Sequence, residues 1–149
     1  NIICVAGGTG LAAVYQVARD FGSNDKPAQI FAGARSADRL YFTEDCKDIA
    51  EVHIATDDGS AGFNGRVTDA LRDYLKTLDA DTLAKTEFYN CGPEPMIHAA
   101  EAVQREFVEA SQTFSAIDYT TKCGVGICGA CASPDGRRIC VDGPFINTH

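Results

Sequence analysis

Apolar and polar residues alternate along the chain in blocks that predict strands and helices in turn. A short apolar run opens the chain and ends at a glycine loop. The apolar residues of the next segment, Leu11, Val14, Tyr15 and Ala18, recur at helical spacing. The same alternation continues as far as residue 109. The expected strands lie at residues 2–6, 28–35, 51–58 and 86–92, and the expected helices at 11–22, 40–50, 65–78 and 93–109.

This alternation predicts a parallel sheet covered on both faces, a doubly wound α/β fold, because each crossover is long and right-handed. After Phe114 the pattern changes, since apolar residues become few and glycines and prolines frequent. Such a segment buries too little apolar surface to hold itself together. We therefore expect a nucleotide-binding α/β domain at residues 1–112 and a small module at residues 113–149, with a boundary near Gln112.

Composition and charge narrow the functional classes. The chain has 149 residues, enough for one core and a small appended module, and a formal net charge of −8. Such acidity argues against nucleic acid or an anionic membrane as a partner. No apolar run approaches the roughly 20 residues that cross a bilayer. Because the chain opens on a strand rather than a secretion signal, we expect a cytoplasmic protein.

Four of the seven cysteines lie close together near the end of the chain, at Cys123, Cys128, Cys131 and Cys140. In a reducing compartment such clustering favours a metal over disulfides. The spacing C-x4-C-x2-C-x8-C begins like that of plant-type ferredoxins, so we predict a [2Fe-2S] cluster on these ligands. The glycines between them allow positive φ angles and let backbone amides approach the sulfides.

Structural zinc on the same four cysteines is the alternative metal site. Zinc ribbons pair two C-x2-C knuckles, and here only Cys128 and Cys131 form one. A nucleotide-binding module with such a zinc site remains a hypothesis from another functional class. Cys4 and Cys46 are expected to be small buried residues. The three histidines show no ligand spacing and are expected to be structural or surface residues.

Unusual loops follow three of the expected strands. The first, Gly7 to Gly10, joins a strand to a helix, where backbone N–H groups at the positive end of the helix favour a pyrophosphate. It is not the full G-x-G-x-x-G pattern, so a tight turn without a ligand stays open. The other two loops, at residues 56–65 and 90–96, fall at the same sheet edge, where open α/β sheets bind ligands.

Two groups in these later loops have a structural alternative. Asp57 and Asp58 can serve a cofactor site, or simply cap a turn and a helix. Cys91 lies at a strand end directly before Gly-Pro, exposed enough to touch a cofactor, although a packed cysteine would also account for it.

Taken together, the motifs GGTG, GARS, TDDGSAG, CGPEPM, CGVGICGAC and CVDGP resemble the ferredoxin-NADP reductase superfamily. Within it they are most similar to the electron-transfer subunits of NAD-linked dihydroorotate dehydrogenases. The resemblance implies a ferredoxin-reductase-like NAD-binding domain with FAD and a [2Fe-2S] cluster. It also implies an FMN-containing catalytic subunit in a hetero-oligomer, which oxidises dihydroorotate in pyrimidine biosynthesis. The flavin is needed because a hydride carries two electrons and the cluster takes one.

The resemblance also implies roles for single residues, carried over by matching motif. The glycine loop would line the pyrophosphate, the second loop the adenosine side and the third loop the nicotinamide side. Cys91 would lie near the reactive end of the nicotinamide, as the candidate catalytic residue, and the four clustered cysteines would bind iron. The implied cofactor-binding residues are Gly8, Thr9, Gly10, Ala34, Arg35, Asp57, Gly59, Cys91, Gly92 and Pro93.

Two departures from the superfamily pattern stand out. Ala13 occupies a position where a proline is usual, and no flavin-binding barrel precedes the nucleotide domain. We therefore expect a C-terminal part of a longer protein that does not hold FAD alone. Small flavin subunits of ferredoxin-NADP oxidoreductases and sulfhydrogenases are the second candidate family. Those related to the oxidoreductase often carry aspartate where this chain has Cys123, which favours the dihydroorotate family. Arg35 leaves NADH and NADPH both open.

Overall fold

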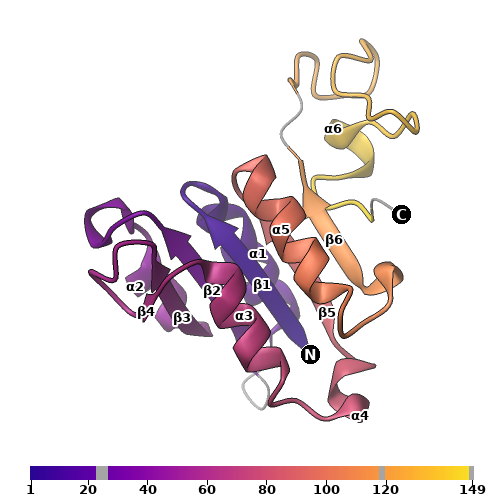
Figure 1. Ribbon diagram of the computed structural model, residues 1–149. Coiled ribbons are helices and arrows are strands. Elements are labelled where there is room, and N and C mark those ends of the chain that lie inside the picture. The colour runs from indigo at the N-terminus through magenta and orange to yellow at the C-terminus, as the bar shows by residue number, and fades with distance from the viewer. Residues whose placement is uncertain (23–26, 118–119, 148–149) are drawn as a thin grey trace.

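The structure, a computed structural model, describes residues 1–22, 27–117 and 120–147 (Figure 1). Strands and helices alternate over most of its length. The strands are β1 (Ile2–Gly7), β2 (Ala28–Ala34), β3 (Ala50–Thr56), β4 (Phe63–Asn64), β5 (Glu87–Cys91) and β6 (Thr113–Ala116). The helices are α1 (Gly10–Phe21), α2 (Thr43–Lys47), α3 (Val67–Leu75), α4 (Ala80–Leu83), α5 (Glu94–Gln104) and α6 (Ile139–Asp142), with short 3-10 turns η1 (Ala37–Arg39) and η2 (Ala110–Gln112).

All strand pairs of the sheet are parallel, in the order β4-β3-β2-β1-β5-β6. The predicted parallel α/β architecture is therefore confirmed. The order reverses at β1: the chain first runs outward through β2 and β3, then returns to the other side of β1 as β5. Ligands of open α/β sheets bind at such a reversal, outside the carboxyl ends of the strands.

Both faces of the sheet are covered by helices, as the doubly wound fold requires. Successive strand residues point to opposite faces, so Cys4 packs in the layer beneath α1 and α2, while Ile3 and Val5 pack in the layer beneath α3 and α5. Figure 1 shows these helices on the two sides of the sheet. The two lone cysteines, Cys4 and Cys46, are fully buried in the first layer, which confirms the sequence-based expectation.

One expected helix is much shorter than predicted. Of residues 40–50, only Thr43–Lys47 form α2. Phe42, before it, has a left-handed φ of 66°, which a helix does not continue through. Ala50, after it, already pairs with Ala28 as the first residue of β3. Sheet pairing thus overrides the local helical pattern at the end of this segment.

Two strands were not predicted, and both are short. The edge strand β4 pairs only through Ala55 and Thr56. The other, β6, buries Thr113 and Ser115 and leaves Phe114 partly exposed, so it lacks the apolar pattern of a buried strand. β6 begins just after Gln112, where we expected the domain boundary. Its four residues nevertheless pair with β5 and belong to the sheet.

The C-terminal segment, residues 120–147 of the described chain, contains α6 and stands beyond the carboxyl end of the sheet, near β6 and the start of α5 (Figure 1). It returns to the sheet at Ile146, whose N–H and C=O pair with the backbone of Ser115. Phe145 packs edge-on against Tyr89 of β5, with ring centroids 5.5 Å apart. Among the described residues, no helix has the length and apolar character that crossing a membrane requires.

Candidate cofactor sites

The loops after β1 and β5 meet at the reversal of strand order. A Cβ atom added to Gly10 would lie 2.2 Å from the carbonyl oxygen of Cys91, and one added to Gly92 would lie 2.9 Å from the backbone nitrogen of Gly7. Such separations are shorter than any real contact, so glycine is required at both positions. The backbones of the two loops therefore approach each other closely at these glycines.

The glycine loop leads directly into the positive end of α1. Gly8 has a φ of 57°, and Thr9 precedes the helix without a capping hydrogen bond from its side chain. α1 has 12 residues, enough to present a helix dipole at this end. This geometry can accommodate a phosphate group, whose binding here stays a prediction. Tyr41, which was not predicted as a site residue, lies near this loop: its hydroxyl would be 3.7 Å from a Cβ on Gly8.

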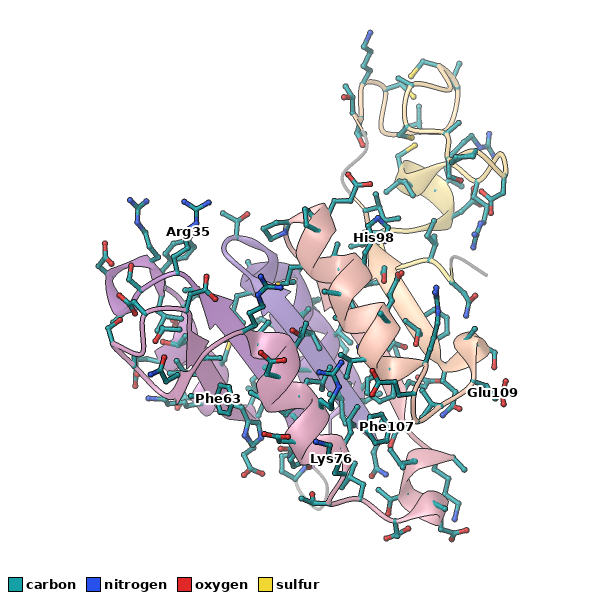
Figure 2. The ribbon with its side chains drawn as sticks, viewed as in Figure 1. Arg35, Phe63, Lys76, His98, Phe107 and Glu109 are labelled. Atoms are coloured by element: carbon teal, nitrogen blue, oxygen red, sulfur yellow. The ribbon has the colours of Figure 1, made fainter. Side chains whose placement is uncertain are left out.

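The ends of β2 and β3 are joined by backbone hydrogen bonds. The Asp57 N–H donates to the Ala34 carbonyl over 3.1 Å, and the Asp58 N–H donates to the Arg35 carbonyl over 3.1 Å. The Arg35 side chain is exposed and projects from the carboxyl edge of the sheet (Figure 2). Arg35 therefore follows the strand next to β1, with its backbone hydrogen-bonded to that of Asp58.

Asp58 serves the turn after β3. Its Oδ1 accepts hydrogen bonds from the backbone N–H of Ser60 over 2.9 Å and from the Ser60 hydroxyl over 2.5 Å, and these bonds lower the pKa of the Asp58 carboxyl. Gly59 has a φ of 71°, and a Cβ there would lie 2.6 Å from the Asn64 side chain. The loop is thus held in one shape next to Asp57.

Cys91 is partly exposed at the end of β5, between β1 and β6. The loop after it is packed by Met96, whose sulfur would lie 2.7 Å from a Cβ on Gly7 and whose methyl would lie 2.8 Å from one on Gly92. Met96 belongs to the CGPEPM motif, yet its packing role was not predicted, because only the folded loop brings it against both glycines.

Backbone N–H groups reach one of the four clustered cysteines. The Cys123 sulfur accepts hydrogen bonds from the backbone N–H groups of Ile127, over 3.4 Å, and Cys128, over 3.5 Å. Cys131 and Cys140 lie close enough to affect each other's pKa. No three His, Cys, Asp or Glu side chains of the described chain converge on a single metal position.

Backbone N–H groups favour the thiolate form of two of these cysteines. Those of Cys128, Val125 and Ile127 lower the pKa of Cys123 to about 6. The pKa of Cys131 is also lowered, first by the N–H of Cys140, whereas the hydrogen bond with Cys131 raises the pKa of Cys140. Thiolates are the form in which cysteines bind metals, so these N–H groups favour the metal-binding form at Cys123 and Cys131.

Local turns bring the distant Cys140 back to the first three cysteines. A tight turn at Ser133 and Gly136 reverses the chain, and the N–H of Ile139 donates to the Cys131 carbonyl over 3.2 Å. Arg138 ties α6 to the cysteine loop by donating to the Gly126 carbonyl over 2.7 Å. This arginine was not predicted, because its partner lies twelve residues away in a loop.

The glycines between the cysteines have the predicted backbone conformation. Their φ angles are 72°, 77° and 70° at Gly124, Gly126 and Gly129. Nothing lies within 4 Å of a Cβ at Gly124 or Gly129, whereas one at Gly126 would meet Val141 at 2.7 Å. Four cysteines in a glycine-rich loop, with N–H groups directed at the Cys123 sulfur, are a donor set that fits a [2Fe-2S] cluster.

Comparisons with known sequences agree with this division of the chain. Residues 4–102 match the family described as the oxidoreductase NAD-binding domain. Residues 120–149 match the iron-sulfur cluster binding domain of dihydroorotate dehydrogenase B.

Among curated proteins, the chain is similar to a "Probable dihydroorotate dehydrogenase B (NAD(+)), electron transfer subunit" of Methanocella arvoryzae, with 34% identity over 99% of this chain and 55% of that protein. The corresponding subunit of Shouchella clausii is 34% identical over 98% of this chain and 55% of its own. Among solved structures, an NADH-dependent reduced ferredoxin-NADP oxidoreductase matches with a TM-score of 0.74 and 31% identity, over 98% of this chain and 51% of that one. The chain thus spans about half the length of the curated relatives it matches.

Proposed function

The chain belongs to the oxidoreductase NAD-binding domain family, and from this premise we propose that it is the nicotinamide- and cluster-binding part of an electron-transfer subunit. Electrons would enter from NAD(P)H at the reversal of strand order and leave through a [2Fe-2S] cluster on Cys123, Cys128, Cys131 and Cys140. The partner would be an FMN-containing catalytic subunit of the dihydroorotate dehydrogenase type, since curated relatives bear that subunit's name.

One observation carries this proposal: backbone N–H groups are directed at the Cys123 sulfur, within the segment that matches an iron-sulfur cluster binding domain. A two-iron cluster takes two protein ligands on each iron, so the four cysteines of this segment supply the donors that it needs. The N–H groups of Ile127 and Cys128 that reach the Cys123 sulfur stabilise negative charge there.

The nucleotide site is proposed at the loops after β1, β2, β3 and β5. Gly8, Thr9 and Gly10 would bind the pyrophosphate at the start of α1. The other members of the proposed site lie along the same edge. They are Ala34 and Arg35 on the adenosine side, Asp57 and Gly59 on the nicotinamide side, and Cys91, Gly92 and Pro93 at the reactive end.

FAD, when bound, supplies the conversion between the two electrons of a hydride and the single electrons that an iron-sulfur cluster carries. In this chain, the partly exposed Cys91 would contact the reactive end of the nicotinamide. Gly10 and Gly92 keep the backbone there free of side chains. We propose that most of the flavin's contacts come from sequence outside these residues.

The division into domains and the compartment are part of the same proposal. The nucleotide-binding domain would take residues 1–112 together with β6, and the cluster module the rest. A cytoplasmic location suits seven free cysteines, because thiols persist in a reducing compartment.

Metal analysis of intact protein purified without oxygen tests the proposal directly. We expect iron and acid-labile sulfide in equal amounts, with a red-brown colour that dithionite bleaches. A colourless, zinc-loaded protein would instead establish the structural zinc site and remove the electron-transfer role.

A second candidate is the small flavin subunit of a ferredoxin-NADP oxidoreductase. The observation in its favour is the match, over 98% of this chain, to the solved oxidoreductase structure. The redox partner distinguishes the two candidates. Reduction of the cluster by dihydroorotate, in the presence of the copurifying subunit, supports the first candidate. Reduction of the cluster by ferredoxin supports the second.

A further inference from the structure

Four polar side chains are buried together where β5, β6 and α5 meet. Asn90 and Gln104 are completely buried, Ser115 is 1% exposed and Glu101 4% exposed. Burying polar groups costs free energy unless they find partners, so the arrangement of their hydrogen bonds is strongly constrained.

These side chains satisfy one another. Asn90 Nδ2 donates to Gln104 Oε1 over 3.0 Å, and Gln104 Nε2 donates back to Asn90 Oδ1 over 2.8 Å. Asn90 Nδ2 also donates to the Ser115 hydroxyl over 3.3 Å, and that hydroxyl donates to Glu101 Oε1 over 2.7 Å. We call these four residues the buried polar network.

The other carboxylate oxygen of Glu101 faces the surface of α5. It lies 3.6 Å from His98 Nδ1 and 3.7 Å from Arg105 Nη2. Figure 2 shows His98 at the end of α5 nearest the cluster segment.

The network joins the two halves of the proposed electron path. Asn90 directly precedes Cys91 at the end of β5, and Gln104 and Glu101 belong to the helix that begins after Pro93. Ser115 bonds Ile146, which follows all four clustered cysteines, through both of its backbone groups, over 2.9 and 3.1 Å. Side-chain hydrogen bonds thus tie β5 and α5 to Ser115, and the backbone of Ser115 in turn pairs with Ile146.

Apolar residues of similar volume would fill this space at little or no cost in stability. A fully satisfied buried network instead fixes one relative placement of the elements that it joins. We propose that the buried polar network is a positioning device, which holds the cluster module at a set distance from the nucleotide site. Ser115 is its central positioning residue. The inference rests on the proposed function, because it concerns electron transfer between the two sites.

The test compares Ser115→Ala with Thr113→Val in the natural full-length protein carrying its cofactors. Thr113 is a matched control: it lies two residues away on the same strand and is 2% exposed. Among the described residues, its Oγ1 is the buried side-chain oxygen that has no hydrogen-bond partner. Both variants lose one buried hydroxyl, but only Ser115→Ala breaks the network.

Two measurements are made on each variant. Stopped-flow absorbance follows reduction of the flavin and of the cluster by NADH, and amide hydrogen exchange follows residues 91–96 and Ile146. For Ser115→Ala we expect cluster reduction at least about threefold slower, flavin reduction changed by less than about twofold, and faster exchange in both segments. Thr113→Val should match the parent in all of these.

The inference is overturned if Ser115→Ala reduces its cluster at the parental rate with parental exchange, or if Thr113→Val shows the same losses. It is also overturned if flavin and cluster reduction slow equally. A parent protein with no reducible cluster would sink the proposed function itself, so the two failures are distinguishable.

Discussion

Gly8 and Gly10 lie in the same loop but are constrained for different reasons. Gly8 has a left-handed φ of 57°, and a Cβ there would touch nothing closer than the Tyr41 hydroxyl at 3.7 Å. At Gly10 the obstacle is the Cys91 carbonyl oxygen, 2.2 Å from an added Cβ. The constraint at Gly8 is conformational. The constraint at Gly10 is steric, because the neighbouring atom belongs to the backbone and cannot rotate away.

Alanine substitutions separate these two constraints. We expect Gly10→Ala to lower the free energy of unfolding by about 3 kcal/mol, because the β1 and β5 loops must move apart. Gly8→Ala should cost about 1 kcal/mol, the cost of a left-handed alanine. Urea unfolding of both variants measures the difference. Equal losses would mean that the loops do not meet as described.

Cys128→Ser removes one of the four proposed iron ligands. We expect loss of the cluster, with its visible absorption, and an unchanged melting transition for the sheet, because all buried members of the two apolar layers lie between Ile3 and Val103. Val125→Ser, an exposed substitution in the same loop, should keep the cluster. If Cys128→Ser also unfolds the sheet, the module and the domain are not independent.

At the scale of single elements, the turn between Cys131 and Cys140 depends on charge. The Arg137 guanidinium donates to Asp135 Oδ2 over 2.6 Å and the Ser133 hydroxyl also bonds this carboxylate, and together they lower the pKa of Asp135 from 3.8 to about 2. Because the pKa of Asp135 is lower in the folded turn, its ionised carboxylate stabilises the turn at pH values above the ordinary pKa of 3.8. That stabilisation is lost as the pH falls from about 4 through about 2.

Titration by NMR of the Asp135 carboxyl carbon checks this. We expect a midpoint near the value of about 2, and a shift upward toward 3.8 in Arg137→Gln, which removes the largest cause. A midpoint near 3.8 in the unaltered protein would show that the arginine contact does not form in solution.

An element could be predicted from the sequence where its own apolar residues recur at strand or helix spacing. This pattern located the approximate positions of the strands β1, β2, β3 and β5 and of the helices α1, α3 and α5. The elements β4, β6, α4 and α6 have four residues or fewer, and pairing with distant chain segments defines both of the strands.

The candidate sites divide in the same way. Cysteine spacing and the glycine loops are local signals, so both candidate sites could be proposed from the sequence. Tyr41, Met96 and Arg138 contact these sites only because of tertiary packing, and nothing local marks them. The buried polar network went unnoticed for the same reason, since Asn90 and Ser115 lie on different strands.

For the whole molecule, Ile146 fixes the cluster segment to the sheet. It is 4% exposed and bonds Ser115 in both directions. We expect Ile146→Ala to weaken this attachment by about 2–4 kcal/mol and to speed amide exchange at Ser115, while amides of β1 stay protected. The control is Ile127→Ala, which removes the same side chain where it is 84% exposed. Equal exchange in the two variants would contradict the anchoring role.

The exposed apolar residues of the molecule include a group beside the cysteines: Val125, Ile127 and Val141 are 64%, 84% and 53% exposed. Such residues near the proposed electron exit suit a protein partner. We expect Ile127→Ser to weaken binding of the acceptor subunit by about tenfold, measured by analytical ultracentrifugation. Phe21→Ser, at the far end of α1, should leave it unchanged. Parental affinity in Ile127→Ser would place the partner on another surface.

The contact between Ser115 and Ile146 means that the metal-binding segment leaves the sheet and rejoins it at one point. Chain insertions whose ends lie side by side are tolerated well, because the host needs no rearrangement to close around them. We therefore expect that a different redox or binding segment can be grafted at this edge of the sheet. The six parallel strands would keep their arrangement.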